Sequence, residues 1–204
     1  GFTALTEIHG DEAAADLAAE FSEAVAPRLG DRGAEEVKSI GDALMIRCDD
    51  AGDAISLGLE IVHQVGGQHR FPTIRAGMHT GPATERAGDW FGTTVNVAAR
   101  VAGEAAGGDV LLTNATLEAL ARPDRFNFRE RGRVNLRNVT EPVLLFRALQ
   151  SGLITAQDLP VDPVCRMAVD PESAAGSLQY EGTLYVFCSL VCAGRFAASP
   201  ELYS

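Results

Sequence analysis

Apolar residues recur at helical spacing in the first part of the chain. Within residues 6–29 the repeat runs through Ala14, Leu17, Ala18, Phe21 and Val25. This period predicts an amphipathic helix. Pro27 weakens its last turn, because proline cannot continue the backbone hydrogen-bond ladder. A second amphipathic helix is predicted over residues 53–65, where two glycines close it, and a third helix over residues 94–106.

Shorter apolar and β-branched runs predict strands between these helices. Residues 36–48 carry such runs on both sides of Gly41-Asp42, which indicates a hairpin. Further strands are expected over residues 73–79, 110–112 and, on either side of Glu141-Pro142, 129–148. A short helix is predicted over residues 114–120, with Thr113 as its N-cap. Helices that alternate with strand pairs favour an α/β (α+β) domain, a mixed sheet with helices packed on it.

The composition changes towards the C-terminus. From Val161 onwards, prolines, aromatic residues and three of the four cysteines gather in a short tail. We therefore predict a first domain over residues 1–150, a linker over 151–160 and a small cysteine-containing domain over 161–204. A chain of 204 residues has room for both.

Charge and hydropathy exclude some functions. The net charge of −11 argues against a nucleic-acid partner, which would need a basic surface. No apolar run is long enough to span a membrane. The chain begins with glycine rather than methionine, so we expect a fragment whose upstream part carries further segments. Clustered rather than evenly spread cysteines indicate a reducing compartment, hence a cytoplasmic protein or the cytoplasmic domain of a membrane-anchored parent.

Five polar residues are candidates for chemistry. Asn96 and Arg100 lie four apart in a predicted helix, so they share one face. An amide beside a fixed cation suits the charge that develops in phosphoryl transfer. Lys38 and Asp89 offer a donor and an acceptor suited to the edge of a purine. Asp42 supplies a hard carboxylate for a divalent metal.

Structural alternatives stand beside these roles. Asp42 follows a glycine and is also a common turn residue. Lys38 and Asp89, taken singly, are ordinary solvated side chains, and Arg100 has Glu104 one helical turn away as an ion-pair partner. His79 is better explained as a hydrogen-bonded histidine at a strand end than as a general base.

Several stretches of the first domain resemble the catalytic domain of class III adenylate/guanylate cyclases. They are residues 1–7 (GFTALTE), 37–45 (VKSIGDALM), 75–81 (RAGMHTG) and 89–100 (DWFGTTVNVAAR), with a looser match at 136–143 (LRNVTEPV). They occur in the family's order and spacing. The resemblance implies the family's fold, a ferredoxin-like mixed sheet with helices packed on it.

The resemblance also implies a role for each matched residue. Asn96 resembles the residue that orients the ribose, and Arg100 the one that stabilises the pentavalent phosphorus. Lys38 and Asp89 resemble the pair that selects adenine over guanine. Asp42 resembles the second of two metal-binding aspartates.

The N-terminal motif of the family begins at residue 1. Phe2 and Thr3 resemble the start of a helix whose backbone N–H groups cradle phosphates. In the family, the first metal aspartate precedes the glycine of this motif by three residues and lies with the first strand, so both fall outside the sequence. We interpret the chain as truncated and expect it to be weakly active or inactive by itself. The resemblance further implies a head-to-tail homodimer, in which metal ligands from one chain meet the remaining site residues of the other.

The tail resembles a YHS domain. The match rests on residues 162–167 (DPVCRM), 180–189 (YEGTLYVFCS), Cys192 and 200–203 (PELY). Three thiolates, those of Cys165, Cys188 and Cys192, suit Zn²⁺ or Cu⁺, and a tail of this size gains stability from a metal. The tail holds no histidine for a fourth ligand. The alternative is that these cysteines are small buried apolar residues packed against Phe187 and Phe196.

These observations predict an adenylate cyclase that converts ATP to 3′,5′-cyclic AMP and pyrophosphate at a homodimer interface. The reaction is two-metal phosphoryl transfer with Mg²⁺ or Mn²⁺, two ions per site, and the tail is a metal-binding regulatory module. A second class stays open, a non-catalytic nucleotide- or metal-sensing module that uses the cyclase fold for dimerisation. A third is a metal-binding chaperone in which the tail is the functional part.

Overall fold

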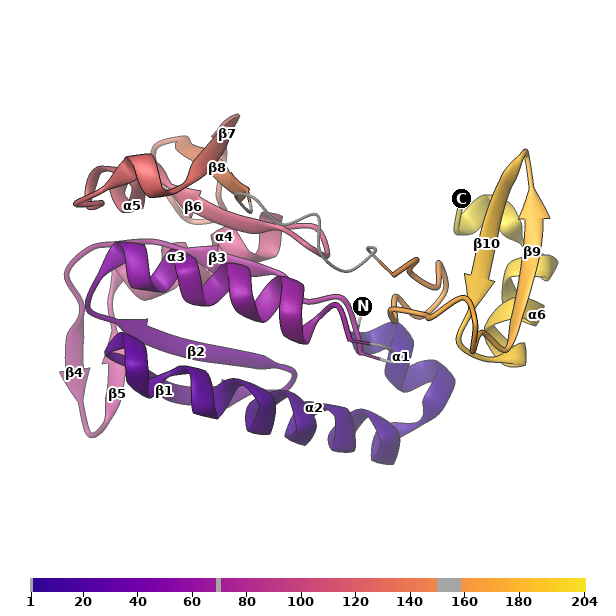
Figure 1. Ribbon diagram of the computed structural model, residues 1–204. Coiled ribbons are helices and arrows are strands. Elements are labelled where there is room, and N and C mark those ends of the chain that lie inside the picture. The colour runs from indigo at the N-terminus through magenta and orange to yellow at the C-terminus, as the bar shows by residue number, and fades with distance from the viewer. Residues whose placement is uncertain (1, 69–70, 150–158) are drawn as a thin grey trace. The chain divides into compact units, whose positions relative to one another are not determined.

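The computed structural model describes residues 2–68, 71–149 and 159–204 (Figure 1). Contacts within the chain define two compact units. The larger unit consists of Ser22–His63 and Ile74–Leu153. The smaller unit consists of Gly1–Phe21, Gln64–Thr73 and Ile154–Ser204. The predicted boundaries near residues 150 and 160 lie largely outside the described residues, so they stay predictions.

A mixed four-stranded sheet is the centre of the larger unit. Its strands lie in the order β3 (Ala76–Met78), β6 (Val110–Thr113), β8 (Val143–Leu149) and β7 (Asn127–Val134). β3 runs parallel to β6, and the other two pairings are antiparallel. The predicted class, helices packed on a mixed sheet, is confirmed.

The central strand β6 is buried on both faces. Val110 and Leu112 pack in one apolar cluster with Ile55 of α3 (Ala51–Glu60), which a π-helical turn extends to Val65. Leu111 belongs to a second cluster, with Val97 and Val101 of α4 (Thr93–Glu104). Alternate side chains of a strand point to opposite faces, so the sheet lies between α3 and α4.

Helix α4 approaches the sheet very closely at Gly77 of β3. A Cβ atom on Gly77 would lie 2.0 Å from the backbone nitrogen of Ala102 in α4. Glycine at this position is therefore a packing requirement, and it fixes the distance between α4 and the sheet.

Two hairpins complete the strands of the larger unit (Figure 1). β1 (Ala34–Ile40) and β2 (Ala43–Cys48) form the predicted hairpin around Gly41-Asp42. The second hairpin, β4 (Thr84–Arg86) and β5 (Asp89–Phe91), was not predicted from the sequence. Its strands are three residues long, and its turn places Ala87 at φ 52° beside a glycine. Alanine rarely adopts a positive φ, so Ala87-Gly88 is a weaker sequence signal for a hairpin turn than Asn-Gly or Asp-Gly.

The prediction of one helix over residues 6–29 was wrong. The structure has two helices, α1 (Phe2–His9) and α2 (Asp11–Val25), separated by Gly10 at φ 89°. α2 ends before Pro27, which lies in a 3₁₀ turn (Ala26–Arg28), and a second such turn (Gly30–Arg32) follows. The other helices are confirmed, including the short α5 (Asn114–Glu118). Two further 3₁₀ turns lie at Pro123–Arg125 and Pro200–Leu202.

The smaller unit is built around a hairpin and a helix in the C-terminal tail. β9 (Gly176–Tyr180) pairs with β10 (Thr183–Phe187), and α6 (Leu190–Ala198) follows. Its apolar core contains the tail residues Val164, Cys165, Met167, Phe187, Cys192 and Phe196. Leu5 of α1 and Ala14 of α2 are buried in the same core. The N-terminal helices therefore pack with the tail in one unit.

Candidate functional site

Asn96 and Arg100 lie on the exposed face of α4. The opposite face of the helix buries Val97 and Val101 in the core. Asn96 and Arg100 are both exposed. Within the part of the chain that the structure describes, neither side chain makes a hydrogen bond or an ion pair, and the alternative pairing of Arg100 with Glu104 is not formed. An amide and a guanidinium are thus held side by side on a well-packed helix and are free to bind an anion.

Lys38 and Asp89 are brought together from strands far apart in the sequence. Lys38 Nζ on β1 donates a hydrogen bond to Asp89 Oδ2 on β5, at 2.5 Å. The other carboxylate oxygen of Asp89 accepts from the backbone N–H of Trp90 at 2.8 Å. Both side chains are about one-third exposed, at 36% and 29%. The pair therefore offers an ordered donor and acceptor at a surface that solvent or a ligand can reach.

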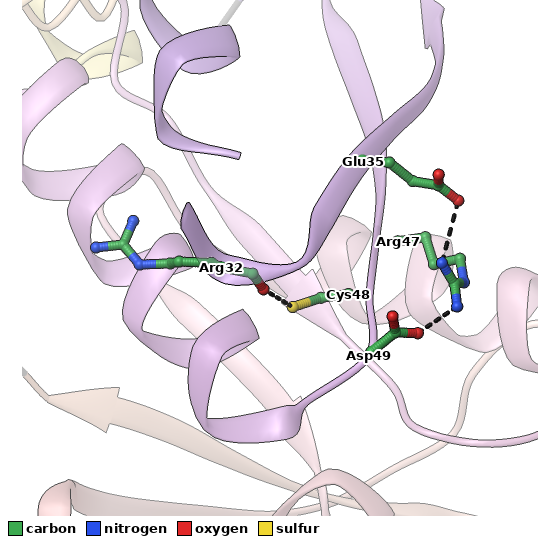
Figure 2. Close-up of polar contacts among 5 residues, drawn as sticks. All are labelled: Arg32, Glu35, Arg47, Cys48 and Asp49. Carbon is green, nitrogen blue, oxygen red and sulfur yellow. Dashed lines mark hydrogen bonds and ion pairs between the residues drawn. The ribbon is translucent and has the colours of Figure 1, made fainter. Parts of the chain in front are cut away.

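Aromatic residues of β5 hold the β1–β2 hairpin beside this pair. Lys38 Nζ lies 5.7 Å from the ring centroid of Phe91, and Arg47 of β2 lies 4.9 Å from that of Trp90. Cations over aromatic faces attract at these distances. Arg47 is oriented by Glu35, at 3.2 Å, and by Asp49 (Figure 2). The position of Lys38 is thus fixed from both strands of its hairpin.

The electrostatics of this region follow from those contacts. The hydrogen bond from Lys38 lowers the pKa of the Asp89 carboxyl below its ordinary value, because it stabilises the charged form. On the next strand, burial raises the pKa of the Cys48 thiol. Cys48 Sγ lies 3.4 Å from the backbone oxygen of Arg32 (Figure 2). Cys48 is therefore a neutral thiol with a structural contact, whereas Asp89 is charged.

A hollow of about 600 Å³ lies next to β5. Thr84, Arg86, Ala87, Phe91 and Gly92 line it. Phe91 belongs both to the hollow and to the surroundings of Lys38. Its half-exposed ring, and the cationic Arg86, were not identified from the sequence, because the hairpin that presents them was not predicted.

Asp42 lies in the two-residue turn between β1 and β2. The turn begins with Gly41 at φ 61°, and the Asp42 carboxylate is exposed. Among the described residues, Asp42 belongs to no group of three or more potential metal ligands. A single exposed carboxylate does not by itself form a site for a hard cation, which takes six or more oxygen ligands.

His79 has a hydrogen-bond partner, as expected for a histidine at a strand end. His79 directly follows β3, and its Nδ1 lies 2.8 Å from Oγ1 of Thr113, the last residue of β6. Thr113 occupies the N-cap position of α5, but its side chain does not cap the helix and contacts His79 and Thr116 instead. Thr113 is thus the N-cap residue, as predicted, but it makes no side-chain capping hydrogen bond. Burial lowers the pKa of His79, because the charged imidazolium loses solvation.

Phe2 and Thr3 form the first turn of α1, in the smaller unit. The helical backbone predicted for the phosphate-binding motif is therefore present, and the binding role of these two residues stays a prediction.

The tail cysteines converge on one point of the smaller unit. Cys188 Sγ lies 3.3 Å from Cys165 Sγ and 3.7 Å from Cys192 Sγ. These distances are too long for disulfides, and all three cysteines are free. Cys165 and Cys192 also belong to the apolar core with Phe187 and Phe196, as the alternative interpretation predicted. Burial in that core and ligation of a metal are compatible.

A fourth residue, not predicted from the sequence, joins the three cysteines. His9 Nε2, at the end of α1, lies 3.7 Å from Cys188 Sγ. Together, His9, Cys165, Cys188 and Cys192 place one ligand atom each within 4.8 Å of all the others. Sequence reasoning considered the tail alone, and no local pattern links His9 to residues so far along the chain.

The thiols of the cluster differ in acidity. A hydrogen bond from Cys165 lowers the pKa of Cys188 to about 6, because it stabilises the thiolate form. The same hydrogen bond, together with burial, raises the pKa of Cys165. Burial raises the pKa of Cys192 to about 12. Cys188 is therefore the most acidic thiol of the three.

The mixed sheet with helices packed on it has the fold of a nucleotide-cyclase type of domain. Residues 1–147 match the adenylate and guanylate cyclase catalytic domain, and residues 161–204 match the YHS domain. The chain belongs to the adenylate and guanylate cyclase catalytic domain family, with a YHS domain at its C-terminus. Both resemblances found in the sequence are confirmed.

Known proteins resemble the two parts separately. A pH-sensitive adenylate cyclase of Mycobacterium tuberculosis is 39% identical over 150 residues, which is 72% of this chain and 38% of that protein. A solved structure of a Trypanosoma brucei adenylate cyclase in its monomeric state is 26% identical with a TM-score of 0.62, covering 72% of this chain and 82% of that one. A copper-transporting P-type ATPase of Rhizobium leguminosarum is 50% identical over 42 residues, 21% of this chain and 5% of that protein.

The chain spans less than two-fifths of the length of the curated cyclases that it matches, 38% of the Mycobacterium tuberculosis protein and 31–32% of two Streptomyces adenylate cyclases. Among the described residues, no helix combines the length and the apolar character that a membrane crossing requires.

Proposed function

We propose that this protein is an adenylate cyclase, which converts ATP to 3′,5′-cyclic AMP and pyrophosphate. The observation that carries the proposal is the ordered pair of Lys38 and Asp89, 2.5 Å apart at an accessible surface. The adenine edge presents an amino donor next to a ring acceptor. Asp89 accepts from the amino group, and Lys38 donates to the ring nitrogen. The similarity to a protein named as an adenylate cyclase supports the same substrate.

The reaction is an in-line displacement at the α-phosphorus of ATP. The ribose 3′-oxygen forms a bond to this phosphorus as it loses its proton, and the bond to the bridging oxygen breaks to release pyrophosphate. Asn96 orients the ribose through its amide. Arg100 stabilises the negative charge that accumulates on the α-phosphoryl oxygens in the transition state. Neither side chain has a hydrogen-bond or ion-pair partner among the described residues, which supports these roles.

We further propose that Mg²⁺ or Mn²⁺, two ions per site, serves the reaction, with Asp42 and its exposed carboxylate as one ligand. When bound, such ions neutralise phosphate charge and lower the pKa of a coordinated hydroxyl. Asp42 belongs to no group of three or more potential metal ligands among the described residues, so the roles above rest on protein groups only.

In this proposal, a homodimer brings the two parts of the site together. Lys38 on β1 contacts Asp89 on β5 of the same chain, whereas Asp42 lies on the turn between β1 and β2. Two copies placed head to tail bring Asp42 of one chain towards Lys38, Asp89, Asn96 and Arg100 of the other. Large exposed apolar residues, Ile40 and Phe91, near these groups support an interface there.

The tail is proposed as a metal-binding module. The thiols of Cys165, Cys188 and Cys192 suit Zn²⁺ or Cu⁺ rather than Mg²⁺, because sulfur ligands prefer soft and borderline cations. Their convergence supports the proposal. So does the similarity of the tail to part of a protein named as a copper-transporting ATPase.

Conversion of ATP to cyclic AMP tests the cyclase proposal directly. The assay uses residues 1–204 and a second form with an added N-terminal strand that carries an aspartate three residues before Gly1. Each form is measured with Mg²⁺ and with Mn²⁺, and GTP serves as the competing substrate. ATP conversion that is lost in Arg100→Ala supports the proposal. A folded, dimeric second form without activity favours instead a non-catalytic nucleotide- or metal-sensing module.

A further inference from the structure

The cluster of His9 and the three tail cysteines has the dimensions of a tetrahedral metal site. An ion at about 2.3 Å from each sulfur and about 2.0 Å from an imidazole nitrogen separates its ligand atoms by roughly 3.5–3.8 Å. Cys188 Sγ lies 3.3 Å from Cys165 Sγ, and 3.7 Å from both Cys192 Sγ and His9 Nε2. All four ligand atoms lie within 4.8 Å of one another. The separations from Cys188 need changes of a few tenths of an ångström, and the longest separation in the cluster, 4.8 Å, has to shorten by about 1 Å.

We propose that His9 is the fourth ligand of a Cys₃His site and that one metal ion joins helix α1 to the YHS tail. The site is therefore assembled from two segments, one from each of the two family domains. His9 lies within residues 1–147, which match the cyclase domain. The cysteines lie within residues 161–204, which match the YHS domain.

The backbone around the cysteines is preorganised by Asp162, which is fully buried. Its Oδ1 accepts from the backbone N–H groups of Val164, at 2.8 Å, and Cys165, at 3.3 Å. Its Oδ2 accepts from the N–H of Cys188 at 2.8 Å. One carboxylate thus fixes the loops that present two of the cysteines, as residues outside the ligand set do in metal sites.

The ligand set selects the class of metal. Three thiolates and one imidazole are typical of structural Zn²⁺ sites, which are four-coordinate and closed. Mg²⁺ and Ca²⁺ prefer oxygen ligands and are excluded by this chemistry. Two of the ligands, Cys165 and Cys192, are buried, which fits a closed structural site rather than an open catalytic one. We therefore take Zn²⁺ as the cation and Co²⁺ as its spectroscopic substitute.

The consequence concerns the beginning of the cyclase domain. Leu5 of α1 already packs in the core of the tail, and His9 ends the same helix. A metal ion bound by His9 and the tail cysteines therefore holds α1 on the YHS domain. α1 also carries Phe2 and Thr3, so under the proposed cyclase function the metal would control the segment that begins the nucleotide-binding motif.

Metal titration of the reduced, metal-stripped 204-residue chain tests the proposal without any cyclase assay. We expect one Zn²⁺ per chain, and with Co²⁺ the visible absorption of a four-coordinate site together with sulfur-to-metal charge transfer. His9→Ala should weaken Zn²⁺ binding by more than 10-fold. Removal of a residue that only hydrogen-bonds to a metal ligand already lowers metal affinity by about 10- to 100-fold. His9→Ala should also shift the Co²⁺ bands.

Two further variants separate ligation from a general effect on the helix. Glu7→Gln changes an exposed residue of the same helix and should leave affinity and spectrum unchanged. His9→Cys restores a ligand and should recover binding, with stronger charge-transfer absorption. Circular dichroism of the metal-free variants confirms that each is folded.

Amide exchange provides an independent readout. Zn²⁺ should slow exchange in α1 of the wild type but not of His9→Ala. The proposal is overturned if His9→Ala binds Zn²⁺ as tightly as the wild type with the same Co²⁺ spectrum, since the site is then formed by the cysteines alone. It is also overturned if the reduced wild-type chain binds no Zn²⁺, or binds only Cu⁺ without a requirement for His9.

Discussion

Lys38 Nζ lies 2.5 Å from Asp89 Oδ2. The contact joins the β1–β2 hairpin to the β4–β5 hairpin, whose strands do not pair with each other. The contact lowers the pKa of the Asp89 carboxyl. A depressed carboxyl pKa means that the pair is fully formed above the ordinary pKa of an aspartate and is lost as the pH falls through the lowered value. At neutral pH the two groups therefore present a fixed acceptor and a fixed donor.

The first prediction concerns the choice of purine. The guanine edge reverses the donor and acceptor of adenine, so Lys38→Glu combined with Asp89→Cys should lower kcat/KM for ATP and raise it for GTP. We expect the ratio of the two to change by more than 10-fold, because each mismatched hydrogen-bonding group costs about 1–3 kcal/mol. Initial rates with each nucleotide, in the form with the added N-terminal strand, measure the change.

Single variants and a neighbour serve as controls for this exchange. Lys38→Glu alone places a carboxylate beside Asp89 and should reduce activity with both nucleotides. Glu36→Gln changes an exposed residue of the same strand and should leave the ratio as it is. An unchanged ratio in the folded double variant would contradict the selector role.

The second prediction concerns Arg100. Arg100→Ala should lower kcat by about 10²- to 10³-fold, the usual cost of removing one transition-state donor. The midpoint of thermal unfolding should stay within about 2 °C of the wild type, since Arg100 is exposed and makes no ion pair among the described residues. Glu104→Gln at the end of the same helix is the matched control and should retain activity. Equal rates for Arg100→Ala and wild type would exclude a catalytic role.

Much of this site could be predicted because its residues are specified locally. Asn96 and Arg100 share a face of α4 through helical periodicity, and the β1–β2 hairpin follows from apolar runs around Gly41-Asp42. The contact of Lys38 with Asp89 is not local. The family resemblance implied that these two act together, whereas spacing along the chain does not bring β1 next to β5.

What could not be predicted depends on backbone geometry or on distant packing. The β4–β5 hairpin turns through Ala87 at φ 52°, where glycine or asparagine is usual. The helix break at Gly10 was missed because the alanine-rich sequence after Gly10 favours helix, and a single glycine does not by itself end one. His9 joins the tail cysteines only because α1 packs in the core of the smaller unit. No single stretch of sequence contains that information.

The third prediction is a pH dependence of stability. Burial lowers the pKa of His79, so the folded state prefers the neutral imidazole. Below the ordinary histidine pKa of about 6.5, the unfolded state binds more protons than the folded state. Stability should therefore fall as the pH drops below about 6.5, and this contribution levels off below the lowered pKa.

Urea unfolding of wild type and His79→Gln across pH 4.5–8 measures this dependence. Glutamine keeps a polar group near Thr113 but does not titrate, so the slope of unfolding free energy against pH should be smaller in the variant. The remaining histidines titrate in both proteins and cancel in the comparison. Identical slopes would mean that His79 is protonated as easily in the folded as in the unfolded state.

The fourth prediction concerns the packing of α4, which carries Asn96 and Arg100. Gly77→Ala places a Cβ atom 2.0 Å from the backbone nitrogen of Ala102, and backbone cannot rotate away as a side chain can. We expect a loss of stability of about 1–3 kcal/mol, the usual range for overpacking. Gly103→Ala in the same helix meets open space and should stabilise by up to ~1 kcal/mol, because alanine favours helix over glycine. Since the shift of α4 moves both exposed side chains, Gly77→Ala should also lower kcat at temperatures where the protein is still folded, whereas Gly103→Ala should not. Equal stability of the two variants would show that α4 does not rest on Gly77 as closely as the structure places it.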